Sequence, residues 1–300
     1  MWQVDTSLAR LLPFASHVRE VSGGWMHFVD EGQGAPLLLV HGNPTWSYLY
    51  RDIVGPLAAR HRVVVPDHLG FGLSERPAGA SYALPWHIAN LRDLVLGLDL
   101  HDLTLVLHDW GGPIGLGAAL ELGDRVRRLV LMNTWAWRLP SGAPIAPILA
   151  AIREPERGER LVLEHNFLVE QGIPGGIYHR DRVTQSLLEA YRRPTADAES
   201  RRAILTLVRS IPVGAAGAAA ETMAGIERGL ASLHLPTLLI WGQRDPVFPP
   251  ATVTVWQRLL PQATVAWLAE ASHFLQEDAP QEIATLLLDW VAAQAGRDGD

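Results

Sequence analysis

The 300-residue sequence contains no cysteine. Disulfide bonds, thiolate metal sites and a cysteine nucleophile are therefore excluded. Basic residues are not concentrated either, since the 25 lysine and arginine residues are scattered along a chain of net charge −7. A nucleic-acid surface needs a basic patch or stripe, so we expect no nucleic-acid partner. The sequence also lacks a metal-binding constellation, a phosphate loop and a dinucleotide fingerprint, and we expect no metal and no cofactor.

Long hydrophobic runs are missing as well. The longest apolar stretch, residues 143–152, contains two prolines and is much shorter than the roughly 20 residues of a membrane-spanning helix. The N-terminal segment, with Asp5 and Arg10, lacks the apolar core of a secretory signal. We therefore expect a cytoplasmic protein with no membrane partner. The hydrophobic content of 48% is ample for a large buried core.

Short apolar runs recur along the chain and predict a mostly parallel β-sheet. Each is rich in Val, Leu or Ile without clean alternation, as expected for strands buried on both faces. Helix-length segments separate most of them, which favours right-handed crossover connections. Two further short runs flank Gly23 and Gly24 and predict an antiparallel hairpin. The predicted strands are residues 18–21, 25–29, 36–40, 62–65, 103–107, 129–132, 237–240 and 264–268, and the clearest intervening helices are 84–100 and 113–122.

The interval between residues 132 and 237 breaks this alternation. It has no comparable strand, and an insertion of this size predicts a helical layer over the carboxyl ends of the strands, where open α/β sheets bind ligands. Its helical patterns are residues 160–170, 181–191 and 198–210, followed by an Ala-rich segment, 215–220, that is typical of a helix returning to the core. We predict a core domain of residues 1–134 and 227–300 and a helical cap domain of residues 135–226.

Polar residues follow several predicted strands, and Asp109 is the most informative. It lies between a strand and a helix start that contains Gly111 and Gly112, which is the sequence context of a nucleophile elbow. A lone aspartate before a helix is more often an N-cap. The chain order Asp109, Asp245, His273, however, matches the order of nucleophile, acid and base in sheets of this kind. We therefore interpret Asp109 as a nucleophile, His273 as a base and Asp245 as the carboxylate that orients the imidazole.

Two other acidic residues have simpler interpretations. Asp278 is predicted to cap the helix that begins near Pro280. Asp67 lies beside Gly70 and Gly72 and is interpreted as a loop former rather than a catalytic residue.

Four motifs give the chain a family resemblance: HGNPTWSYLYR (41–51), PDHLGFGLSERP (66–77), HDWGG (108–112) and HFLQEDAP (273–280), together with the cap segment 166–171. In this order and spacing, the sequence resembles the haloalkane dehalogenases of the α/β-hydrolase superfamily over essentially its whole length. The resemblance implies an α/β-hydrolase fold, with a mostly parallel central sheet, helices on both faces and an inserted helical cap.

The resemblance also implies a reaction. Asp109 would displace halide from an sp3 carbon and form an alkyl ester, which water activated by His273 would hydrolyse. The backbone N–H groups of Asn43 and Trp110 would form an oxyanion hole. The side-chain amide of Asn43 and the indole of Trp110 would bind the halide. The partners would be a small apolar halogenated substrate, water and the halide product.

Some members of the family carry the catalytic acid as a glutamate after the strand 129–132. Here that position is Asn133, so the acid should be Asp245, as in the branch with an Asn/Trp halide clamp. Candidate walls of the substrate pocket, each equally compatible with plain core packing, are Phe167, Val247, Phe248 and Phe274.

Two other functions are compatible with these residues. An epoxide hydrolase would share the triad but needs cap tyrosines, of which the sequence offers only Tyr178 and Tyr191, and Asn43 stands where such enzymes usually carry an aromatic residue. A non-catalytic small-molecule binder would need none of Asp109, Asp245 and His273. The sequence makes no prediction of oligomeric state.

Overall fold

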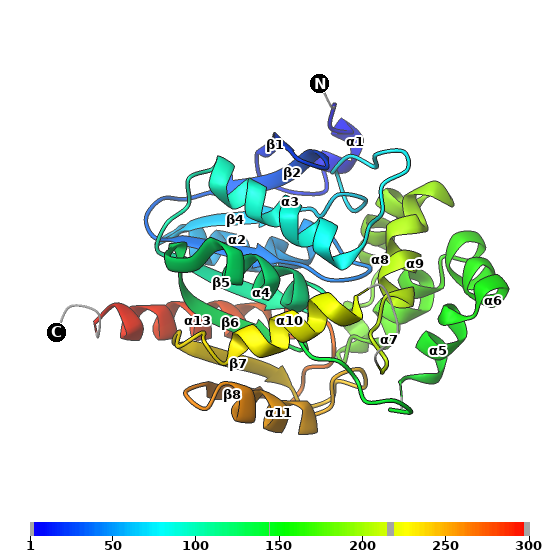
Figure 1. The fold of residues 1–300 in the computed structure, drawn as a ribbon. Helices are drawn as coiled ribbons and strands as arrows, with labels where there is room; N and C mark the ends of the chain where they lie inside the picture. The colour runs from blue at the N-terminus through cyan, green and yellow to red at the C-terminus, as the bar shows by residue number, and fades with distance from the viewer. Residues whose placement is uncertain (1–2, 144, 215–218, 297–300) are drawn as a thin grey trace.

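The computed structural model describes residues 3–143, 145–214 and 219–296, which form an eight-stranded sheet in the order β1-β2-β4-β3-β5-β6-β7-β8 (Figure 1). The first two strands form the predicted hairpin, β2 also pairs antiparallel with β4, and all other neighbours are parallel. Every predicted strand is confirmed. The strands are β1 (Ser16–Val21), β2 (Gly24–Glu31), β3 (Pro36–Val40), β4 (Arg62–Pro66), β5 (Leu103–His108), β6 (Val126–Met132), β7 (Thr237–Gly242) and β8 (Thr264–Leu268).

Helices cover both faces of the sheet because successive strand residues point to opposite sides. In β3, Leu38 and Val40 pack in one core cluster, and Leu37 and Leu39 pack in the other. The first cluster contains residues of α3 (Leu84–Gly97), α4 (Gly111–Leu122), α10 (Ala220–Leu230) and α11 (Ala251–Leu259). The second contains residues of α2 (Arg51–Ala58) and α13 (Pro280–Ala295). The α/β-hydrolase arrangement expected from the resemblance is therefore observed.

A group of helices lies beyond one end of the sheet (Figure 1). These are α5 (Pro147–Arg153), α6 (Pro155–Glu159), α7 (Ile173–Gly175), α8 (Gln185–Arg192) and α9 (Arg202–Arg209). All lie between β6 and β7, an interval whose described residues form no strand beyond a single bridge from Leu139 to Val213. That bridge joins the two ends of the insertion, with Leu139 donating to the carbonyl of Pro212 at 2.9 Å.

The inserted helices are more broken than the sequence pattern suggested. The predicted helix 160–170 is interrupted at Asn166, whose φ of 50° is a left-handed conformation that asparagine tolerates. Its side-chain amide donates to Thr195 Oγ1 at 2.8 Å and so joins two turns of the insertion. Residues 215–218 of the Ala-rich segment lie outside the described residues. The helix that follows, α10, begins at Ala220 and packs against α4, so the predicted boundary at 226/227 falls inside one helix.

The prediction that Asp278 caps the following helix is wrong. The residue preceding α13 is Ala279, which makes no side-chain cap. The Asp278 carboxylate instead accepts hydrogen bonds from the backbone N–H groups of Tyr178 and His179, each at 2.9 Å, and of Ser272 at 2.8 Å. The cap thus folds back onto the segment that carries His273. The Asp278 carboxylate joins the two by accepting hydrogen bonds from backbone N–H groups of both.

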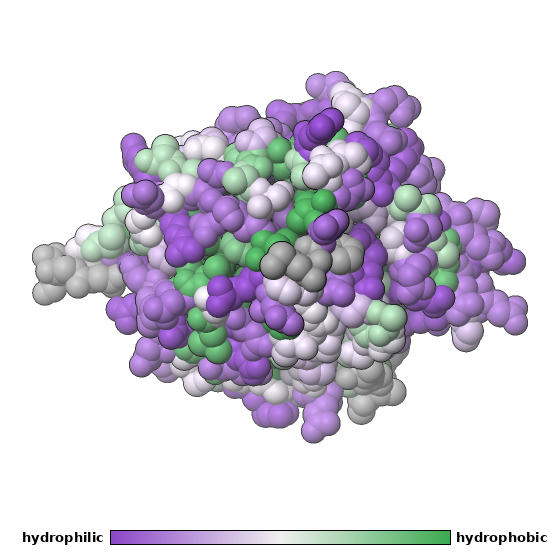
Figure 2. Space-filling view, turned by 90° about the horizontal axis from the view of Figure 1, so that it is seen from above, coloured by the Kyte–Doolittle hydropathy of each residue, from purple (hydrophilic) through white to green (hydrophobic). Residues whose placement is uncertain are grey.

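Hydrophilic residues dominate the face of the molecule seen from above, and hydrophobic ones form only small scattered groups (Figure 2). Within the described ranges, none of the helices is long and apolar enough to span a bilayer.

Candidate active site

The predicted site residues meet at the carboxyl ends of the strands. Asp109 follows β5, Asp245 follows β7 and His273 follows β8. All three are nearly enclosed, with exposed fractions of 6%, 3% and 5%. Segments far apart in the sequence come together here because the parallel strands end at the same edge of the sheet.

Asp109 occupies a strained turn. Its φ of 49° lies in the left-handed region, which costs free energy for a non-glycine residue and is typical of functional positions. The backbone is held on both sides, since Asp109 N–H donates to Asn133 O at 3.2 Å and its carbonyl accepts from the Thr134 hydroxyl at 2.6 Å. Leu107, larger than the residue usual before an elbow, fits because Gly115 in α4 has no side chain to meet it.

The three candidate catalytic side chains lie next to one another, with His273 between the two aspartates. His273 Nδ1 lies 3.1 Å from Asp245 Oδ2, and His273 Nε2 lies 3.8 Å from Asp109 Oδ2. The other oxygen of Asp245 accepts from the N–H groups of Val247 at 2.7 Å and Phe248 at 3.1 Å, which fixes the carboxylate. The imidazole is thereby oriented with Nε2 toward the nucleophile, the arrangement that a nucleophile–base–acid triad needs.

Burial and charge shift the titration of two of these groups. Burial raises the pKa of Asp109 above its ordinary value, opposed by the charge of His273 and the backbone N–H groups of Trp110 and Asn43. Burial alone would lower the pKa of His273, but the charge and hydrogen bond of Asp245, and then the charge of Asp109, raise it. The carboxylate of Asp109 is thus poorly solvated, and the imidazole is supported as a cation.

The backbone N–H groups of Asn43 and Trp110 both act on the Asp109 carboxylate. The backbone N–H of Asn43 donates to Asp109 Oδ1 at 2.7 Å, and the backbone N–H of Trp110 helps to lower the pKa of the carboxyl group. The side-chain amide of Asn43 donates to the carbonyl of Ile204 in α9 at 3.1 Å. The sequence did not indicate this contact, which leaves the second amide hydrogen of Asn43 for another acceptor.

The candidate pocket residues differ in their surroundings. The ring of Phe274 lies 4.7 Å from that of His273, and the ring of Phe248 lies 5.7 Å from it. Phe167 is half-buried in the cap. Val247 is 37% exposed and contributes its backbone N–H to Asp245, as described above. The two phenylalanines beside the imidazole are therefore the better placed to contact a substrate.

Sequence reasoning missed several residues around the triad. His108 Nε2 donates to the carbonyl of His273 at 2.9 Å, and burial holds the pKa of His108 well below its ordinary value, so the ring is neutral. Trp135 packs edge-on against Trp110, with 4.9 Å between ring centroids. Thr134 holds the elbow, as described above. All three lie within three residues of a strand end, which was the available signal.

Asp67 organises a loop, as predicted. Its buried carboxylate accepts from Ser47 N at 2.6 Å and Leu73 N at 2.8 Å, and pairs with His27 Nδ1 at 2.9 Å.

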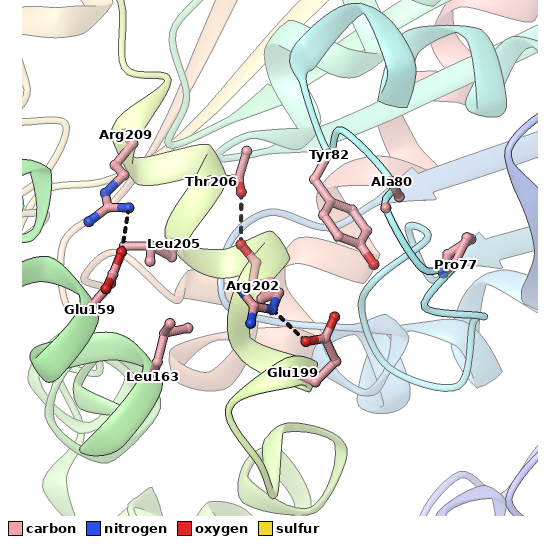
Figure 3. Close-up of a pocket in the computed structure, with 11 residues that line it drawn as sticks. Pro77, Ala80, Tyr82, Glu159, Leu163, Glu199, Arg202, Leu205, Thr206 and Arg209 are labelled. Atoms are coloured by element: carbon pink, nitrogen blue, oxygen red, sulfur yellow. Dashed lines mark hydrogen bonds and ion pairs between the residues drawn. The ribbon is translucent and has the colours of Figure 1, made fainter. Parts of the chain in front are cut away.

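A cavity of about 510 Å³ opens between the loop 77–82 and α9 (Figure 3). Two ion pairs face it, Arg202 with Glu199 and Arg209 with Glu159, so both arginine charges are neutralised locally. None of the predicted site residues lines this cavity. It lies against Leu205, the neighbour of the Ile204 whose carbonyl holds Asn43.

The protein is an α/β hydrolase by its sheet order, by the elbow at Asp109 and by the contact of His273 with Asp109 and Asp245. Comparisons with known proteins agree. A family model for the alpha/beta hydrolase fold matches residues 35–280. Haloalkane dehalogenase 2 of Mycobacterium tuberculosis is 40% identical over 283 residues, which cover 93% of this chain and 96% of the relative. The cis-3-alkyl-4-alkyloxetan-2-one decarboxylase of Shewanella oneidensis is 36% identical over 282 residues, 93% and 88% of the two chains.

Solved structures give the same result. Haloalkane dehalogenase DbeA from Bradyrhizobium elkani superimposes with a TM-score of 0.88 and 29% identity, covering 94% of this chain and 99% of that one. The chain belongs to the haloalkane dehalogenases, hydrolases of the α/β-hydrolase fold that act on carbon–halogen bonds.

Proposed function

We propose that this protein hydrolyses the carbon–halogen bond of small apolar haloalkanes through a covalent ester on Asp109, releasing an alcohol, halide and a proton. The observation that carries the proposal is the unequal surroundings of the two Asp109 oxygens. Oδ1 accepts the Asn43 N–H at 2.7 Å, whereas Oδ2 faces His273 Nε2 at 3.8 Å. Oδ1 is positioned as an ester carbonyl oxygen in an oxyanion hole, so Oδ2 is the oxygen that attacks.

In the first step, Asp109 Oδ2 forms a bond to the sp3 carbon as the carbon–halogen bond breaks and the halide leaves with the electron pair. A carboxylate needs no deprotonation for this step at neutral pH. The halide needs donors in a site that excludes water. The indole N–H of Trp110 and the second amide hydrogen of Asn43 supply them, with the amide held by Ile204.

In the second step, His273 takes a proton from water as the water oxygen attacks the ester carbonyl carbon. The bond from that carbon to the alkoxy oxygen then breaks, the alcohol leaves with the proton from His273, and the carboxylic acid left on Asp109 ionises to release the remaining proton. Esterification makes this step easier, because it removes the Asp109 charge that helps to raise the pKa of His273. The imidazole is then more readily neutral and able to act as a base. Asp245 stabilises the imidazolium that forms.

We also propose that the inserted helices form a cap domain over this site. The boundary is better placed before Ala220 than at residue 226, since α10 packs on α4 as one helix. The contact of Ile204 with Asn43 makes the cap part of the halide site.

The tyrosines of the cap argue against an epoxide hydrolase. Tyr191 donates its hydroxyl to Glu277 at 2.5 Å, and Tyr178 is 39% exposed. Tyr191 is therefore already hydrogen-bonded and Tyr178 lies at the surface, which does not fit a pair of tyrosines that protonate an opened epoxide.

A second candidate function comes from the decarboxylase relative, whose name specifies an oxetan-2-one. Asp109 would attack the sp3 ring carbon bonded to the ring oxygen, and the bond between these two atoms would break. The leaving group would then be a carboxylate in place of a halide, held by the same donors from Asn43 and Trp110. Loss of CO2 from that intermediate would give an alkene and return the electron pair to Asp109. This reaction needs no base, which separates it experimentally from hydrolysis.

A substrate panel decides between these functions. Bromoalkanes, terminal epoxides and a 3,4-dialkyl oxetan-2-one are incubated with the wild-type protein and with Asp109→Ala, and halide, diol and CO2 are measured separately. We expect halide release that Asp109→Ala abolishes. CO2 without halide would support the second candidate, diol alone would support an epoxide hydrolase, and no product would support a non-catalytic binder.

Replacing His273 with phenylalanine separates the two steps. The displacement does not use the base, whereas hydrolysis does, so the variant should release about one halide per site and then stall. Intact-protein mass spectrometry should show an added alkyl group, and digestion should locate it on Asp109. Continued turnover, or an alkyl group on another residue, would contradict the mechanism.

A further inference from the structure

Asn133 is buried immediately after Met132, the last residue of β6. It is fully enclosed, and its φ of 36° is left-handed. Both ends of its amide are used. Nδ2 donates to the carbonyls of Ser272 at 2.8 Å and His273 at 3.3 Å, and Oδ1 accepts the N–H of Gly242 at 3.0 Å.

These contacts join the segments that carry the triad. Gly242 ends β7, immediately before the turn that carries Asp245. The backbone carbonyl of Asn133 accepts the N–H of Asp109 at 3.2 Å. One residue therefore touches the base segment and the acid segment through its side chain, and the nucleophile through its backbone.

The chemistry of the amide is specific to this place. Two carbonyls need donors and one N–H needs an acceptor. A side-chain amide supplies two N–H hydrogens and an acceptor oxygen within one short group, whereas a hydroxyl has a single hydrogen. A carboxylate there would face two carbonyl oxygens without a hydrogen to offer. The geometry is thus suited to orienting His273 and unsuited to an acid at position 133.

We propose that Asn133 is a positioning residue that holds His273 at its distance from Asp109 and so controls the hydrolytic step far more than the displacement. The proposal rests on the two-step function proposed above. The displacement depends on Asp109, whose link to Asn133 is through the backbone and survives changes of the side chain. Hydrolysis depends on the base, whose segment the side chain holds.

The effect should be large but not complete, because a second group holds the same segment. His108 Nε2 also donates to the carbonyl of His273. Removing the residues that orient a reacting group typically costs about 10- to 100-fold.

Asn133→Gly is the informative variant, since glycine keeps the left-handed backbone and removes only the amide. We expect a halide burst close to the wild-type rate and amplitude, followed by a steady-state rate about 10- to 100-fold lower. The matched control is Asn90→Ala. Asn90 is equally buried and also uses both ends of its amide, but on Gly23, Ser22 and Trp86, away from the site. This control should lose stability while keeping both rates per folded molecule.

A readout without substrate makes the test independent of the reaction. Loosening His273 from Asp245 weakens the main influence that raises the histidine pKa. NMR titration of His273, assigned against His273→Phe, should therefore give a lower pKa in Asn133→Gly than in Asn90→Ala. The acid limb of the steady-state pH profile should shift in the same direction.

The positioning role is overturned if burst and steady-state rates fall by the same factor, if neither changes, or if the His273 pKa is the same in all variants. If the wild type releases no halide, the proposed function fails, and the NMR titration still decides whether Asn133 positions the imidazole.

Discussion

The buried carboxylate of Glu277 joins the core to the cap, and its removal should destabilise the protein strongly. The Arg51 guanidinium in α2 donates to both Glu277 oxygens, each at 2.7 Å. The hydroxyl of Tyr191 in α8 donates to Oε1 at 2.5 Å. The Glu277 side chain is only 3% exposed and that of Arg51 17%, so water replaces neither partner readily.

The size of the destabilisation depends on which partners Arg51 retains when the Glu277 charge is removed. Breaking a buried ion pair by removing one partner costs about 3–5 kcal/mol. Arg51 keeps an ion pair with Asp52 at 3.3 Å and a hydrogen bond to the Tyr48 carbonyl at 3.1 Å, and it lies 4.1 Å from the centre of the Tyr48 ring. We therefore expect Glu277→Gln to cost about 3 kcal/mol, the lower end of that range. Tyr191→Phe, which leaves the ion pair intact, should cost about 1.5 kcal/mol.

Urea unfolding followed by tryptophan fluorescence measures these free energies. The control is Glu199→Gln, which removes an ion pair with Arg202 whose side chains are 61% and 55% exposed. Exposed pairs contribute little, so this variant should stay within about 1 kcal/mol of the wild type. The double replacement Arg51→Met with Glu277→Leu should recover part of the loss, because no buried charge is left unpaired.

A cost below about 1 kcal/mol for Glu277→Gln would refute this reasoning, because it would mean that the pair is solvated or compensated elsewhere. The reasoning would also be contradicted if the double variant lost as much free energy of unfolding as the two single variants together, or more.

Three further outcomes are expected. Burial alone would raise the pKa of Asp67, yet the hydrogen bond and charge of its partner histidine lower it. The carboxylate therefore stabilises the fold above its unfolded pKa of about 3.9 and less as pH falls through the folded value. Asp67→Asn should cost about 2–4 kcal/mol at pH 7, and the difference should shrink below about pH 4 in urea titrations; a pH-independent difference would contradict this. Gly42→Ala places a methyl group on the Asp109 carboxylate and should lower kcat/KM for halide release about 100-fold. The control Gly55→Ala adds a methyl group that meets nothing within 4 Å and should leave kcat/KM unchanged. Equal kcat/KM values for the two variants would show that the nucleophile tolerates displacement. Asp245→Asn should keep the halide burst and slow steady-state turnover by about 100-fold or more, and normal turnover would move the acid elsewhere.

Much of the fold was predictable because its signals are local. Strands buried on both faces need continuous apolar runs, and their spacing by helix-length segments leaves few topologies other than a parallel sheet. The insertion was predictable from the absence of such runs between β6 and β7. Its helix boundaries were not, because a turn such as that at Asn166 is fixed by a partner, Thr195, from another part of the cap.

The candidate site divides in the same way. The sequence by itself determined which residues stand at strand ends, and so brought forward Asp109, Asp245 and His273, because parallel strands deliver their carboxyl ends to one edge. Only the tertiary structure decided how Asn43, Asp278 and the other polar groups around them pair. The bond from Asn43 to Ile204 and those from Asp278 to the cap backbone each span about 100 residues or more. Such pairings depend on where the cap folds back onto the sheet, and no local pattern records which unpaired N–H or carbonyl a buried side chain will meet.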